Sequence, residues 1–157
     1  SGGTLSATVA GNVANDGTLQ GATAATVSAT GSFTQTAQSK LVSDGGITLS
    51  AASQTNHGTV SAGGTLSDTI ASDITNDGTE QSAGAMSVTA GGALTQTTLG
   101  KLTGGSGITL SSATLTNHGN ATADLDRRDR ARKRPQDRNR GSGPRTRHPG
   151  RRAGPGV

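Results

Sequence analysis

The chain has 157 residues with one Phe, no Trp, Tyr or Cys, and only 29% hydrophobic residues. This composition excludes a thick globular core and a disulfide framework. The formal net charge of +4 is unevenly spread, because residues 1–120 hold two lysines against five aspartates and one glutamate, a formal charge of −4. Few apolar residues with little charge are typical of a thin solenoid, whose turns bury a few side chains against each other.

A repeat of about 61 residues organises most of the chain. Residues 2–58 align without a gap with residues 63–119, and more than half of the aligned positions are identical. Glycine-rich corners divide each unit into three laps of about 20 residues, the length of one coil of a parallel β-helix. The six predicted laps cover residues 2–20, 21–43, 44–61, 63–81, 82–103 and 104–121.

Apolar and hydroxyl residues alternate within each lap, as in a half-buried strand. No window carries a helical stripe, and β-branched residues are frequent. The predicted fold is therefore all-β, a right-handed parallel β-helix of about six coils. The predicted interior contains Leu5, Val9, Ile47, Leu49, Leu66, Ile70, Ile74, Val88, Leu94, Ile108 and Leu110.

Asn-Asp-Gly and Asn-His-Gly triplets close four laps, at Asn15, Asn56, Asn76 and Asn117. We interpret them as corners in which Gly takes a positive φ and Asn bonds to neighbouring backbone. Asn residues of stacked coils could also form an amide ladder. Asp68 breaks the alternation by standing where Ala7 points inward, so we expect a bulge or a loose lap there.

The composition changes after Asn120. Residues 127–152 contain eleven Arg and one Lys, all four prolines lie between residues 135 and 155, and residues 126–156 contain no large aliphatic side chain. We therefore divide the chain into β-helix repeats at 1–121 and a disordered basic tail at 122–157. The tail could bind nucleic acid through its charge, but we favour a frameshift product over a functional basic arm.

His57 and His118 are the histidines of the repeat region, and paired histidines are common zinc ligands. They occupy equivalent positions three coils apart, about 14 Å at roughly 4.8 Å per coil, whereas a zinc ligand lies about 2 Å from the ion. We interpret both as polar corner residues. No metal, cofactor-binding or catalytic residues are expected.

A carbohydrate-active β-helix enzyme is the alternative, with Asp16, Asp77 and Glu80 as candidate carboxylates. Asp16 and Asp77 are again three coils apart, whereas glycoside cleavage needs carboxylates about 5 to 9.5 Å apart. All three were assigned to glycine corners, so we expect no enzyme activity.

Two further motifs carry weaker signals. The Thr-Gln-Thr triplets at residues 34–36 and 95–97 resemble ice-binding ranks, but such a face needs one rank per coil and the triplet occurs once in three. Asn120-Ala121-Thr122 matches a glycosylation sequon.

The corner motifs resemble repeats of filamentous haemagglutinin-like exoproteins. The resemblance rests on Gly-x-Leu starts and on residues 54–60, 74–78 and 115–119, and it covers residues 2–121. It implies a structural shaft segment of a large secreted bacterial protein that serves adhesion or delivery of a growth-inhibition toxin.

The same resemblance implies a bacterial cell-surface location and two partners. One is a receptor or glycan on a host or neighbouring cell. The other is an outer-membrane transporter, which this family engages through an amino-terminal domain that the sequence lacks. The chain starts at Ser1 without an export leader, an apolar run of about 18 residues or a lipidation motif, so we expect a piece of a longer protein.

Overall fold

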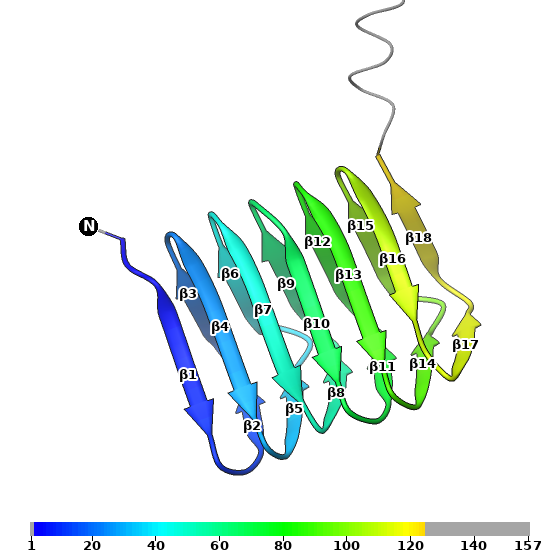
Figure 1. The fold of residues 1–157 in the computed structure, drawn as a ribbon, viewed down its shortest axis with the longest axis horizontal. Coiled ribbons are helices and arrows are strands. Elements are labelled where there is room, and N and C mark those ends of the chain that lie inside the picture. The colour runs from blue at the N-terminus through cyan, green and yellow to red at the C-terminus, as the bar shows by residue number, and fades with distance from the viewer. Residues whose placement is uncertain (1, 125–157) are drawn as a thin grey trace, which may run out of the picture. The chain divides into compact units, whose positions relative to one another are not determined.

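The computed structural model describes residues 2–124, which form a parallel β-helix of six coils (Figure 1). The predicted all-β solenoid is thus confirmed, while its right-handed winding stays a prediction. No helix long and apolar enough to cross a membrane occurs in these residues. The basic tail lies outside the described residues from Leu125 onward, and the division at 121/122 stays a prediction.

Each coil contributes one strand to each of three six-stranded sheets. The first sheet consists of β1 (Leu5–Val9), β4 (Ala24–Ala29), β7 (Gly46–Ala51), β10 (Leu66–Ile70), β13 (Ala85–Ala90) and β16 (Gly107–Ser111). The second consists of β2 (Val13–Asn15), β5 (Ser32–Gln35), β8 (Ser53–Asn56), β11 (Ile74–Asn76), β14 (Ala93–Gln96) and β17 (Thr114–Asn117). The third consists of β3 (Thr18–Gly21), β6 (Lys40–Ser43), β9 (Thr59–Ala62), β12 (Thr79–Ser82), β15 (Lys101–Gly104) and β18 (Asn120–Ala123).

Successive coils stack in register without a bulge in these pairings. Leu66 of β10 pairs with Ile47 of β7 on one side and with Met86 of β13 on the other. Because the pairing is parallel, each inward position continues as a column along the axis. The repeat unit seen in the sequence therefore equals three coils.

The columns of inward side chains form a single core. Phe33, Leu41 and Leu49 are fully buried in it. Of the predicted interior residues, those of the inner coils are buried, while Leu5, Val9, Ile108 and Leu110 are only partly buried. The difference follows from their place, because a terminal coil has a neighbour on one side only.

The outer face of the first sheet carries hydroxyl side chains in every coil. Two outward positions per strand are Ser or Thr throughout, and the register aligns them in two columns. The first column contains Ser6, Thr26, Thr48, Ser67, Ser87 and Thr109. The second contains Thr8, Ser28, Ser50, Thr69, Thr89 and Ser111.

Candidate functional site

A row of carboxamides runs through the interior at the end of the second sheet. Every coil places Asn or Gln there, and the register aligns Asn15, Gln35, Asn56, Asn76, Gln96 and Asn117. Sequence reasoning found the four asparagines but missed both glutamines, because it interpreted Gln35 and Gln96 only as parts of Thr-Gln-Thr triplets. Their signal was their spacing, since each stands midway in the series of corners.

Hydrogen bonds explain why this row is polar. Asn56 Nδ2 donates to Asn76 Oδ1 at 3.0 Å, which is one rung of the expected amide ladder. The glutamines instead reach backbone, as Gln35 Nε2 donates to the carbonyl of Thr59 at 2.6 Å and Gln96 Nε2 to that of Asn120 at 2.6 Å. These side chains satisfy carbonyls at the corner between the second and third sheets, where the chain changes direction.

The corner glycines correct one expectation. Within residues 2–124, positive φ occurs only at Gly11 and Gly107, so the Asn-x-Gly corners do not need it. In each corner the Gly amide donates to the Asn side chain two residues earlier, as Gly58 N does to Asn56 Oδ1 at 3.0 Å. Gly78 is required for another reason: a Cβ there would collide with the carbonyl oxygen of Gly58 in the preceding coil.

Two carboxyl groups lie inside the β-helix. Asp68 is 1% exposed and Glu80 is not exposed at all. The amide of Gln54 joins them, with Nε2 at 2.8 Å from Glu80 Oε1 and 3.4 Å from Asp68 Oδ2. Asn56 Nδ2 lies 3.4 Å from the same Glu80 oxygen.

Both carboxyls contradict the sequence-based expectations. Asp68 lies in an unbroken strand and points inward, with neither a bulge nor a loose lap. Glu80 is in β12 and not in a solvated corner. Strand alternation decides both cases, because each stands at an inward position of its strand.

The surroundings of this pair favour the uncharged form. Burial raises the pKa of Asp68 from 3.8 to about 7, partly opposed by the hydrogen bond from Gln54. Burial and the proximity of Asp68 raise the pKa of Glu80 well above 4.5, partly opposed by hydrogen bonds from Asn56 and Gln54. Raised carboxyl pKa values are typical of general acids, but a polysaccharide cannot reach these groups through the wall of strands. Their role is therefore internal.

On the outside, the same two coils are linked by a polar contact. His57 Nδ1 lies 3.2 Å from Asp77 Oδ2, and Thr97 Oγ1 of the next coil donates to Asp77 Oδ1. These hydrogen bonds from Thr97 and His57 lower the pKa of Asp77. The histidine side chain is 44% exposed, in agreement with its interpretation as a polar corner residue.

The other candidates stay apart. His57 follows β8 and His118 follows β17, with β11 and β14 between these strands, and the corner of Asp16 is likewise three coils from that of Asp77. Among residues 2–124, no three His, Cys, Asp or Glu side chains are grouped to hold a metal ion. In the sequon, Thr122 Oγ1 donates to Asn120 Oδ1 at 2.6 Å.

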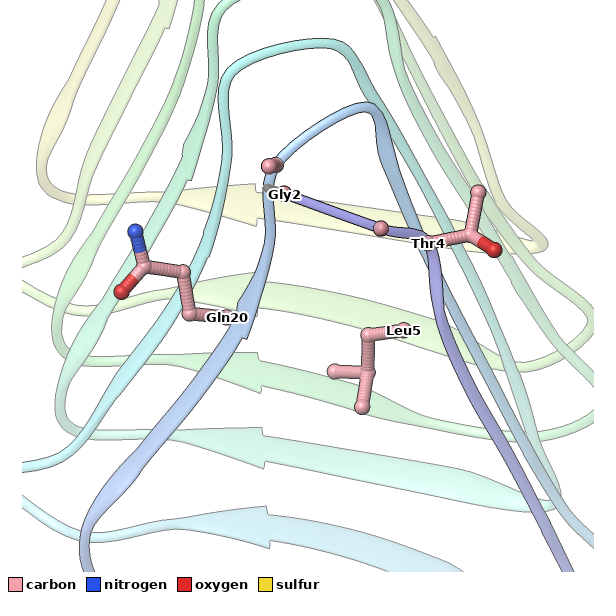
Figure 2. A pocket seen from close by; sticks show the side chains of 6 residues that line it. Gly2, Thr4, Leu5 and Gln20 are labelled. Carbon is pink, nitrogen blue, oxygen red and sulfur yellow. The ribbon is translucent and has the colours of Figure 1, made fainter.

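A shallow hollow lies at the open end of the first coil. It is lined by Gly2, Gly3, Thr4, Leu5, Gln20 and Ala22. Figure 2 shows the side chain of Leu5 pointing into the interior of this coil. The hollow is thus the uncovered end of the apolar core, without a charged side chain in its lining.

Comparison with known proteins places these features. The model of the haemagglutinin repeat family matches residues 1–51 and 42–127. The chain is 42% identical over 119 residues to the deoxyribonuclease CdiA of Dickeya dadantii strain 3937. That alignment covers 74% of this chain but only 3% of the relative. No solved structure matches.

Proposed function

Because this chain belongs to the haemagglutinin repeat family, we propose that it is a shaft segment of a large secreted bacterial surface protein. The shaft holds a distant part of the protein away from the cell that makes it. That distant part binds a host or neighbouring cell, or delivers a growth-inhibition toxin. The observation that carries this proposal is the continuous, fully filled core, in which each coil is held by the coils on both sides.

We assign no chemistry of its own to the segment. The relative is named a deoxyribonuclease, and since this chain matches only 3% of it, we place such an activity elsewhere in the parent protein. Glu80, the carboxylate with the most perturbed surroundings, is sealed in the core. An acid/base role for it would require a substrate inside the β-helix.

The proposed partners follow from this role. The parent protein reaches the outside through an outer-membrane transporter and binds a receptor or glycan on the target cell. The shaft itself offers an uncharged outer face, the two hydroxyl columns of the first sheet, and this face supports a secondary role as a contact surface. Neither nucleic acid nor a cofactor is assigned to residues 2–124.

The test compares core and corner substitutions in the full-length parent protein. Leu49→Asp places an unpaired charge at a position that is not exposed, so we expect loss of surface display. His57→Ala with His118→Ala removes only exposed side chains, so display and adhesion should remain within about two-fold of the unmodified protein. Antibody labelling of cells and a target-cell adhesion assay measure both properties.

One outcome would overturn the proposal. If the double histidine variant keeps normal display but loses adhesion, the corners form a binding site and the segment is not merely a shaft. The third variant, Asp77→Asn, is assayed for polysaccharide cleavage. Turnover by the unmodified protein that this substitution abolishes would establish the enzyme alternative instead.

A further inference from the structure

We propose that this chain binds a second copy of itself head to tail, with β1–β3 of one molecule pairing in parallel with β16–β18 of another. The inference goes beyond the proposed function and does not depend on it. Within residues 2–124, these six strands pair on one side only (Figure 1). Their free edges present unpaired backbone N–H and C=O groups, which are a template for another strand.

The molecule already contains a template for this junction. The third coil (β7–β9) stacks on the fourth (β10–β12), with Leu66 opposite Ile47, Ile74 opposite Gln54 and Thr79 opposite Thr59. The repeat of 61 residues makes the first coil equivalent to the fourth and the sixth equivalent to the third. A second copy on the sixth coil would therefore repeat a pairing that the chain forms internally.

Transferring that register gives a specific set of contacts. Leu5 of one molecule lies opposite Ile108 of the other, Val13 opposite Leu115, and Thr18 opposite Asn120. In the single molecule Leu115 is 54% exposed, although it stands at an inward position of its column. Docking in this register covers it as Ile74 covers Gln54.

The intermolecular junction lacks the buried carboxyls of the internal one. Gln54, Asp68 and Glu80 of the third and fourth coils correspond to Leu115, Ala7 and Leu19 at the ends. Where the internal junction must neutralise two carboxyls, the intermolecular one brings together three apolar side chains. Burying apolar surface without desolvating charge makes the copied junction the more favourable of the two.

The polar contacts of the template are conserved between the two junctions. The His57–Asp77 contact corresponds to His118 of one molecule and Asp16 of the next, and both side chains are exposed in the single molecule. The Asn56–Asn76 hydrogen bond corresponds to Asn117 and Asn15. The two ends are thus complementary in both charge and hydrogen bonding.

Glycines at the first coil supply an independent argument. A Cβ at Gly78 would collide with Gly58 of the preceding coil, and a Cβ at Gly64 would be 3.1 Å from the Gly45 carbonyl carbon. The equivalent residues Gly17 and Gly3 would meet nothing within 4 Å. The first coil therefore keeps glycines that only a coil stacked beneath it would require.

Since the two docking surfaces differ, the association is heterologous and does not close. It should produce linear oligomers that lengthen with concentration. Sedimentation velocity of the whole chain between about 1 and 100 times the dissociation concentration measures this growth. We expect the weight-average sedimentation coefficient to rise past the dimer value.

Leu115→Arg and Leu99→Arg form a matched pair for this measurement. Both leucines are exposed, 54% and 75% respectively, but Leu99 lies between β14 and β15 and not at an end of the β-helix. We expect Leu115→Arg to weaken association at least ten-fold and Leu99→Arg to leave it unchanged. A strict monomer, a dimer that does not lengthen, or equal behaviour of the two variants would each overturn the proposal.

Cross-linking tests the register and remains decisive if Leu115→Arg fails to fold. The chain has no cysteine, so Ser6→Cys with Thr109→Cys introduces a pair that corresponds to Ser67 and Thr48, which are paired in the template. Neighbouring strands are about 4.8 Å apart, within the usual Cα separation of a disulfide. Oxidation should produce a ladder of covalent oligomers that reducing agent removes.

Thr4→Cys with Thr109→Cys is the out-of-register control. Thr4 lies two residues further along the chain, which places the two Cα atoms about 8 Å apart, too far for a disulfide. Ser67→Cys with Thr48→Cys should give an intramolecular bond only. Equal ladders from the in-register and out-of-register pairs would show random collision and would contradict the proposed junction.

Discussion

At the scale of single residues, Asp68 and Glu80 are the positions where the core departs from its own pattern. Other coils place Ala, Val or Leu in the Asp68 column and Leu, Val or Ala in the Glu80 column. A buried ionised carboxylate without a cation is costly, so the folded state takes up protons instead. The resulting proton uptake links the stability of this junction to pH.

The sign of the linkage follows from the raised pKa values. Because both folded-state pKa values exceed the unfolded ones, the stabilisation is fully present below about pH 4 and is lost as the pH rises through 7. For Asp68 the loss is about 4 kcal/mol. Urea unfolding followed by circular dichroism at pH 5 and pH 8 should show the lower free energy of unfolding at pH 8.

A variant that copies the chain's own alternative is the control. Asp68→Ala with Glu80→Leu reproduces the residues Ala7 and Leu19 of the first coil. Its free energy of unfolding should change much less between pH 5 and pH 8. If this variant and the unmodified chain lose stability equally, the pH dependence arises elsewhere, and the assignment to the buried pair is wrong.

At the scale of elements, the corner after β11 is limited by space. Gly78→Ala forces the backbone of the fourth coil away from Gly58, which should lower the free energy of unfolding by about 1–3 kcal/mol. Gly17→Ala is the matched control, because a Cβ there meets nothing within 4 Å. Thermal unfolding at a concentration below the onset of association compares the two variants, and equal losses would show that φ, not space, selects glycine.

The alternation in the sequence was sufficient to predict the strands, the coil count and most of the core. It also applied to Asp68 and Glu80, but hydrophobicity was used to decide which way these residues point. In a β-helix the register of neighbouring coils leaves a polar residue no freedom to turn outward, so position outweighs polarity. The Gln54 link was beyond prediction, because it depends on side-chain contacts between different sheets.

The carboxamide row shows the same lesson for a site. Asn15, Asn56, Asn76 and Asn117 were found because they share a motif with glycine. Gln35 and Gln96 have the same structural role without that motif, since a longer side chain reaches the carbonyls across the corner. Counting equivalent positions in every coil would have found them, whereas a search for recurring letters did not.

At the scale of the whole molecule, stability is shared between neighbouring coils, because each coil contacts chiefly the coils before and after it. Removing one whole coil should then leave the remaining junctions intact, whereas removing part of a coil breaks the register of all three sheets. The fifth coil is suited to this test. It lies outside the Gln54–Asp68–Glu80 cluster, and its removal leaves that cluster complete.

Deletion of residues 83–104 joins Ser82 to Gly105, and the pairing of Ser82 with Gly104 shows that these ends are equivalent points of successive coils. We expect a folded rod, shorter by about 4.8 Å, with an unchanged β signal per residue in circular dichroism and cooperative unfolding. Deletion of residues 93–104 removes only β14 and β15, so the sixth coil loses its partners in two sheets. This shorter deletion should lose more stability than the longer one, and the opposite order would refute a shaft built of separable coils.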